Sequence, residues 1–230
     1  MIEIIATSPE DARRIQDCGA DRIELVSALS EGGLTPSYAI IDKTVKAVTI
    51  PVNVMIRPHS RTFAYTQEEI KIMKEDIRVA KNLGANGVVI GVLDENMKIH
   101  EAFMEELLDS CQDMDVTFHR AIDELPDPVE GARFLSKYPN IKTILTSGGK
   151  GNITDNIPTI REMVKSSGHI TIMVGGGLNF ENIDRIIRET EAGFFHFGTA
   201  VRENRSPSGE INVESLRYII NLVRKARNSL

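Results

Sequence analysis

Short runs rich in β-branched and aromatic residues recur along the chain, and each is followed by a stretch with the apolar spacing of an amphipathic helix. Strand and helix alternating in this way are typical of parallel βαβ units, and eight units are the number that closes a (β/α)₈ barrel. The pattern therefore predicts one α/β domain, a TIM barrel over residues 1–230. Its predicted strands are residues 2–5, 22–25, 52–56, 87–90, 116–118, 142–145, 170–174 and 194–197.

Three of the predicted helices begin at a residue that can cap a helix. Each capping side chain is followed three positions later by an acidic residue: Ser8 by Asp11, Thr66 by Glu69, and Asp127 by Glu130. An open doubly wound sheet is the rival architecture, and it would place a glycine-rich dinucleotide turn directly after the first strand. Residues 6–9 read Ala-Thr-Ser-Pro, which favours the barrel.

Side chains of a barrel strand alternate between the surrounding helices and the barrel interior. In the second strand Ile23 and Leu25 face the helices, so Arg22 and Glu24 face inward. The same parity gives the inward polar set Glu3, Arg22, Glu24, Asn53, Arg57, Thr117, His119 and His196. We expect its charged members to converge at the carboxyl ends of the strands, where barrel enzymes carry out their chemistry.

The inward charges allow two interpretations. They can form a satisfied buried network that only fixes register, or they can form a catalytic site. Two carboxylates, two arginines and two imidazoles are costly to desolvate together, which favours catalysis. In that interpretation Glu3 or Glu24 acts with His119 as acid and base, while Arg57 and Arg120 clamp the substrate.

Glycine-rich stretches follow the seventh and eighth predicted strands, where barrels often bind phosphate. Without a Cβ atom the backbone can approach an anion closely, so these stretches predict a phosphate or carboxylate site, although they can also be simple tight turns. Hydroxyl and amide donors after the sixth strand extend the same rim. The predicted anion-binding residues are Arg22, Thr146, Ser147, Gly148, Gly175, Gly176, Gly177, His196, Gly198 and Thr199.

Composition and charge narrow the classes of partner. A net charge of -6 and the absence of a basic, aromatic-rich cluster argue against nucleic acid. We find neither a basic leader before an apolar run nor an apolar stretch of about 18 residues, so we expect a cytoplasmic protein with no membrane partner. Cys18 and Cys111 lack the spacing of a metal or redox motif, and we expect both to be reduced residues in the last turns of helices.

Five segments taken together resemble one known family. They are Gly-Ala-Asp-Arg-Ile-Glu-Leu at 19–25, Leu-Ser-Glu-Gly-Gly-Leu-Thr-Pro-Ser at 29–37, Ile-Arg-Pro at 56–58, Thr-Phe-His-Arg at 117–120 and Leu-Thr-Ser-Gly at 145–148. In order and spacing they resemble the CutC family of copper homeostasis proteins. The family pattern covers Glu3, Arg22, Glu24, Ser30, Glu31, Gly32, Gly33, Arg57, His119, Arg120, Thr146 and Ser147.

The resemblance implies a cytoplasmic (β/α)₈ barrel, a homo-oligomer (dimer or tetramer), and a role in copper homeostasis or copper binding. The chain departs from the family pattern at Val26, where relatives often carry Cys, and at residues 59–62. Cu(I) prefers thiolate and thioether ligands, and neither cysteine is predicted at a strand end, so the metal ligands are not evident.

Two functions remain open. One is copper homeostasis, and the other is an enzyme of unassigned reaction that acts on a small anionic, phosphorylated or sugar-like substrate. A scaffold whose polar mouth is a relic is the third interpretation.

Overall fold

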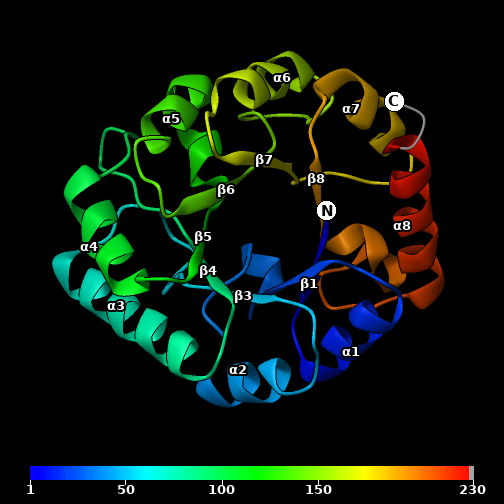
Figure 1. The fold of residues 1–230 in the computed structure, drawn as a ribbon, viewed down its shortest axis with the longest axis horizontal. Coiled ribbons are helices and arrows are strands. Elements are labelled where there is room, and N and C mark those ends of the chain that lie inside the picture. Colours follow the sequence, from blue (N-terminus) through cyan, green and yellow to red (C-terminus); the bar gives the residue numbers. More distant parts are fainter. Residues whose placement is uncertain (228–230) are drawn as a thin grey trace.

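The computed structural model describes residues 1–227, and these form a closed barrel of eight parallel strands in sequential order (Figure 1). The predicted domain extends to residue 230, and residues 228–230 lie outside the described residues. The predicted strands are confirmed to within one residue at each end. They are β1 (Ile2–Ala6), β2 (Arg22–Leu25), β3 (Val52–Met55), β4 (Gly87–Ile90), β5 (Asp115–Phe118), β6 (Ile141–Thr146), β7 (Thr171–Val174) and β8 (Phe194–Phe197).

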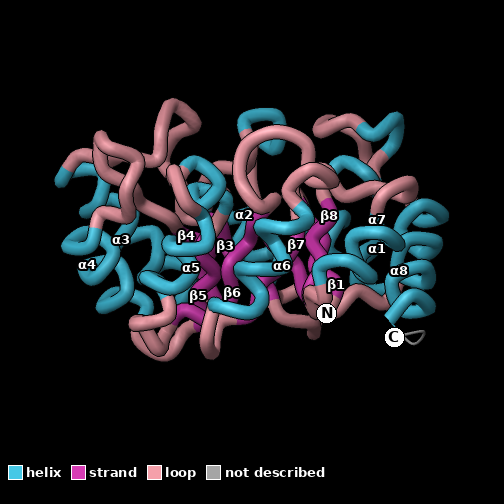
Figure 2. Tube along the Cα trace, turned by 90° about the horizontal axis from the view of Figure 1, so that it is seen from above, coloured by secondary structure: helices cyan, strands magenta, loops and turns pink. Residues whose placement is uncertain are grey.

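Eight α-helices surround the barrel within the described residues (Figure 1). They are α1 (Pro9–Asp17), α2 (Tyr38–Val45), α3 (Gln67–Asn82), α4 (Glu101–Cys111), α5 (Pro128–Leu135), α6 (Ile157–Ser166), α7 (Ile183–Thr190) and α8 (Val213–Arg227). Long loops rise above the strands at the end opposite the N-terminus, which is the carboxyl end of the barrel (Figure 2). Short 3₁₀ helices within them are η1 (Leu29–Glu31), η2 (Arg120–Glu124), η3 (Thr199–Val201) and η4 (Glu203–Arg205).

None of the helices in residues 1–227 combines the length and the apolar character needed to cross a membrane. Both cysteines are free thiols, as predicted. Cys18 follows the last residue of α1, and Cys111 is the last residue of α4.

The three predicted helix caps are confirmed. The Ser8 hydroxyl accepts a hydrogen bond from the Asp11 amide (3.0 Å) at the start of α1. Asp127 accepts from the amides of Val129 and Glu130 at the start of α5. At α3 the capping box is complete (Thr66 accepts from the Glu69 amide, and the Glu69 carboxylate accepts from the Thr66 amide). These bonds satisfy amides that the first helical turn leaves without partners.

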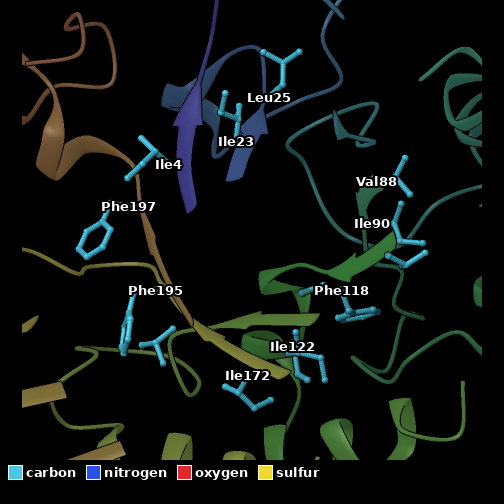
Figure 3. Close-up of a cluster of buried hydrophobic side chains, with 14 of the residues drawn as sticks. Ile4, Ile23, Leu25, Val88, Ile90, Phe118, Ile122, Ile172, Phe195 and Phe197 are labelled. Carbon is cyan, nitrogen blue, oxygen red and sulfur yellow. The ribbon is translucent and has the colours of Figure 1, made fainter. Parts of the chain in front are cut away.

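Alternation along the strands divides the apolar side chains into two groups. Outward residues such as Ile23, Leu25 and Phe195 pack beneath the helices in the main core (Figure 3). A separate small cluster of Ile5, Val26, Met55 and Val89 lies inside the barrel. The predicted parity of the strands is therefore confirmed, and strand register places this cluster level with Glu24 or nearer the carboxyl end, above Glu3 and Arg22.

Strand register places three charged residues next to one another in the lower part of the barrel. Glu3 of β1 is paired with Arg22 of β2 on one side and with His196 of β8 on the other. All three side chains point inward and are buried. The first and last strands therefore close the barrel at the position where its interior is most polar.

Replacing Thr66 by Ala should lower the free energy of unfolding by about 1 kcal/mol, because the Glu69 amide loses its cap. The measurement is chemical denaturation followed by circular dichroism. Gln67→Ala, one residue further along the exposed helix surface, is the control and should change stability by less than about 0.5 kcal/mol. Equal effects of the two substitutions would show that the cap contributes nothing.

Candidate active site

A cavity of about 500 Å³ opens at the carboxyl end of the barrel, and we call it the mouth cavity. Its base includes the apolar side chains of Ile5, Met55 and Leu145. Nine residues of the site predicted from the sequence line this cavity. They are Glu24, Arg57, His119, Arg120, His196, Gly176, Gly177, Gly198 and Thr199. Strands β2, β3, β5, β7 and β8 therefore bring nine of the fifteen predicted site residues to one concave surface, and this size is typical of a small-molecule site.

Glu3 and Arg22 do not line the mouth cavity, which corrects the prediction that all the inward charges meet at one end. They stand at the beginning of their strands and form a buried ion pair below the cavity. Parity predicts which face of the sheet a side chain takes, but not its height along the barrel. Their position makes these two residues a support for the groups above them.

A chain of polar contacts leads from this ion pair up to the cavity. Glu3 Oε1 lies 2.8 Å from His196 Nδ1, and His196 Nε2 lies 3.7 Å from Glu24 Oε2. The second separation is an ion-pair distance, too long for a good hydrogen bond. Glu24 Oε1 is buried without a hydrogen-bond partner in the described chain. Glu24 therefore presents a carboxyl group that is held only electrostatically.

The environment shifts the pKa values of these groups in opposite directions. Burial raises the pKa of Glu24 to about 7, and the negative charge of Glu3 adds to this. Burial alone would lower the pKa of His196, but the carboxylates of Glu24 and Glu3 outweigh it and raise that pKa. Burial opposes ionisation of Glu3 as well, yet Arg22 and His196 hold the Glu3 pKa below its usual value. Glu24 and the imidazolium beside it can therefore exchange a proton near neutral pH.

His119 is buried at the opposite side of the interior from this pair, at the end of β5. Burial and the charge of Arg57 lower its pKa to about 3, so the imidazole is neutral. Its Nδ1 accepts a hydrogen bond from the Ala121 amide (3.1 Å), which requires the proton to be on Nε2. Nε2 has no partner within the described residues. His119 is therefore a hydrogen-bond donor at the cavity and a poor base.

Arg57 reaches the mouth cavity from the loop after β3 and is held by backbone oxygens. Its Nη1 donates to the carbonyls of Glu31 (3.0 Å) and Gly33 (3.2 Å), and Nη2 donates to that of Ser60 (3.3 Å). The guanidinium lies 4.8 Å from the centre of the Phe63 ring. These contacts fix the position of the cation without neutralising its charge.

The loop after β6 surrounds a residue that the sequence did not indicate, Asp123 of η2. Its buried carboxylate accepts hydrogen bonds from the Thr146 hydroxyl (2.5 Å), the Ser147 amide and hydroxyl, and the Gly149 amide. The predicted anion donors of this loop are therefore already occupied, because Thr146 and Ser147 donate to Asp123 and the Gly148 amide donates to the Thr146 hydroxyl oxygen. All three residues are buried and do not line the mouth cavity. Only the spacing of Arg120 and Asp123, three residues apart, hints at Asp123 in the sequence.

Asp123 also positions Arg120 at the cavity rim. Arg120 Nε donates to Asp123 (2.8 Å), and Nη2 donates to the Ser147 hydroxyl (3.0 Å). A Cβ atom at Gly176 would lie 2.6 Å from the Arg120 guanidinium carbon and would displace it, and the φ of 80° at Gly176 also favours glycine. Gly91, which the sequence did not indicate as a site residue, leaves room for the His119 side chain. A Cβ atom at Gly91 would lie 2.4 Å from the His119 ring.

The loops after β7 and β8 keep free backbone donors. The amides of Gly176, Gly177 and Gly198 donate to no acceptor within the described chain, whereas the Gly175 amide donates to the Thr146 carbonyl and lies outside the cavity lining. A side chain at Gly198 would not fit without a shift, because its Cβ atom would lie 2.9 Å from Ile5 Cδ1. Unpaired amides on a concave surface can bind an anion. Of the two sides of the predicted anion site, only the β7 and β8 side retains its donors.

Copper, which the resemblance implies, can be compared with the donors at hand. Glu3, Glu24 and His196 can bring one ligand atom each within 4.8 Å of one another. Two carboxylates and an imidazole are hard to borderline ligands, and Arg22 already occupies Glu3. Cys111 donates to the Leu107 carbonyl, and burial raises its pKa to about 12. The residues at the mouth therefore do not fit Cu(I).

Fold and cavity together define a class of protein, a (β/α)₈ barrel with a polar small-molecule site at the carboxyl ends of its strands. The family model of the CutC family matches residues 1–201. The chain belongs to the CutC family.

Two curated relatives and a solved structure illustrate this membership. The human copper homeostasis protein cutC homolog is 40% identical over 197 residues, which cover 85% of this chain and 72% of the human protein. The family protein CutC of Pasteurella multocida is 38% identical over 190 residues, 82% of this chain and 78% of that protein. The crystal structure of CutC from Streptococcus agalactiae superposes with a TM-score of 0.81 at 34% identity, covering 86% of this chain and 97% of that chain.

Glu24 should titrate with a midpoint near pH 7, because burial favours its neutral form. The carboxyl carbon resonances of labelled glutamate would show this, and Glu24→Gln would assign the signal. Since the folded chain binds this proton more tightly than the unfolded chain, the free energy of unfolding should fall as pH rises from about 4.5 to about 7. That fall should be smaller in Glu24→Gln. A midpoint at the ordinary value of 4.5 would contradict the assigned environment.

Proposed function

We propose that the barrel is an enzyme that moves a proton to or from a small anionic substrate, with Glu24 and His196 as the proton-carrying pair. The observation that carries the proposal is the Glu24 carboxyl group, which is buried, lines the mouth cavity and has no hydrogen-bond partner at Oε1 among the described residues. A pKa of about 7 allows it to serve as either acid or base at neutral pH. A group of this kind is costly to bury, and such groups gather at active sites.

The surrounding residues support distinct roles. Glu3 hydrogen-bonds His196 and favours the imidazolium, so it acts behind the cavity and not as the base that meets the substrate. His119 is suited to donate a hydrogen bond from Nε2 to a developing oxyanion, because its imidazole is neutral and keeps its proton on that nitrogen. Arg57 and Arg120 supply positive charge to the cavity wall, Arg57 beside His119 and Arg120 beside Gly176.

Anion binding by the free amides of the β7 and β8 loops completes the proposal. Gly176, Gly177 and Gly198 line the mouth cavity with unpaired donors, which supports a phosphate or carboxylate group at this position. The apolar side chains of Ile5 and Met55 line the cavity together with Glu24, which favours reaction of a substrate in a partly apolar environment. Both features favour a substrate that is anionic at one end and reacts beside Glu24.

A role in copper homeostasis is the second candidate, and the name of the human relative supports it. Because the mouth residues do not fit Cu(I), we propose that any link to copper runs through the reaction and not through chelation at this site. The family resemblance further supports a cytoplasmic homo-oligomer, a dimer or a tetramer, as part of the same proposal.

Glu24→Gln should abolish turnover, because the amide keeps the shape of the side chain but can neither accept nor supply the proton. Purified protein would be incubated with a metabolite extract, and mass spectrometry would follow the anionic compounds that are consumed. Glu68→Gln, the same change on the exposed surface of α3, is the control and should turn over the same compound at the rate of the unmodified protein. Full activity of Glu24→Gln on that compound would refute the proposal.

Titration with Cu(I) under reducing conditions, against a competing chelator, should show no binding tighter than micromolar. The reason is that both thiols stand outside the mouth cavity and burial keeps Cys111 protonated. Cys18→Ser and Cys111→Ser should leave the titration unchanged. Tight binding that either variant removes would establish direct chelation by the chain and restore copper as cargo.

A further inference from the structure

Arg57 is a buried cation, and no carboxylate among residues 1–227 forms an ion pair with it. Its side chain lies in the wall of the mouth cavity with 8% of its surface exposed. Its Nη1 and Nη2 donate to backbone carbonyls, the neutral Tyr65 phenol also interacts with the guanidinium, and Nε has no close hydrogen-bond partner within residues 1–227. Burying a charge in this way is unfavourable unless an opposite charge lies beside it. The Phe63 ring recovers only part of that cost.

His119 supplies a second unused donor beside Arg57. Both side chains contact Phe63, each at 4.8 Å from its ring centre. His119 Nε2 carries a proton, is buried and has no acceptor among the described residues. Arg57 Nε and His119 Nε2 are therefore two unpaired N–H groups in one part of the cavity wall, next to one uncompensated positive charge. A carboxylate, with two acceptor oxygens in one plane, satisfies all three needs.

The free amides of the β7 and β8 loops lie across the barrel from this pair. In a closed ring of eight strands, β3 stands opposite β7. Arg57 follows β3, and Gly176 and Gly177 follow β7, so the two sets of donors face each other across the mouth cavity. Glu24 of β2 and His196 of β8 also line the cavity, on the strands next to β3 and β7.

From this arrangement we infer that the ligand carries two anionic ends, a carboxylate held by Arg57 and His119 and a phosphate-like group held by the amides of Gly176, Gly177 and Gly198. A cavity of about 500 Å³ has room for a short chain joining the two ends above Glu24. The inference rests on the proposed function and narrows its substrate to the class of phosphorylated carboxylic acids. It also assigns Arg57 and His119 as specificity determinants for the carboxylate end.

The test compares two series of probes of increasing chain length by isothermal titration calorimetry, phosphonocarboxylates and the matched alkylphosphonates that lack the carboxylate. At the best-fitting length the phosphonocarboxylate should bind about tenfold tighter or more, because its second end gains charge-assisted hydrogen bonds. Arg57→Gln should remove this preference and leave alkylphosphonate affinity within about twofold. Should that variant fail to fold, Arg57→Lys retains the charge and should still reduce the preference, because it loses the planar Nε donor.

Two further variants separate the possible failures. Arg61→Gln changes an exposed arginine of the same loop and should keep the full preference. Gly198→Ala, whose methyl group would meet Ile5 Cδ1 at 2.9 Å and so shift the loop that carries the free Gly198 amide, should weaken both series equally and leave their ratio unchanged. If alkylphosphonates bind and phosphonocarboxylates bind no tighter at any length, the two-ended ligand is wrong and the proposed anion site stands. If neither series binds below about ten millimolar, the anion site of the proposed function is wrong as well.

Discussion

The position of the Glu3 carboxylate between Arg22 and His196 is the contact on which the rest of the site depends. One oxygen pairs with a permanent cation and the other with an imidazole nitrogen, so the carboxylate stays ionised although it is completely buried. It thereby favours the charged form of His196 and adds a negative charge near Glu24. Without it, Glu24 alone would oppose the effect of burial on the pKa of His196, and the charged imidazolium would be less favoured.

The fold followed closely from the sequence because its signals are local. Alternating apolar residues and capping side chains such as Thr66 act within a few positions of one another, and the strand ends they predict agree with the structure. Parity also identified Glu24, His119 and His196 correctly as interior residues. These properties depend on the period of a strand or helix, which a single sequence displays directly.

The remainder of the site depends on distances between segments that the sequence does not display. Glu3 and Arg22 were expected at the mouth because parity gives no height, and the register with β8 decides it. Asp123 was missed because its partners come from the loop after β6. The Asp123 carboxylate accepts hydrogen bonds from the hydroxyl and amide groups of residues 146–149, which the composition of this loop had suggested as donors to a ligand. Composition thus reveals which donors exist, and only tertiary contacts show which remain unpaired.

The pairing of β1 with β8 has a consequence for how the protein is made. Glu3 is synthesised 193 positions before its partner His196. Until the last strand is synthesised and closes the ring, a growing chain carries an ionised glutamate and an arginine with no assembled proton-carrying pair. The proton-carrying pair that we propose therefore exists only in a completed barrel, and a chain interrupted before β8 would lack it however well its earlier units had folded.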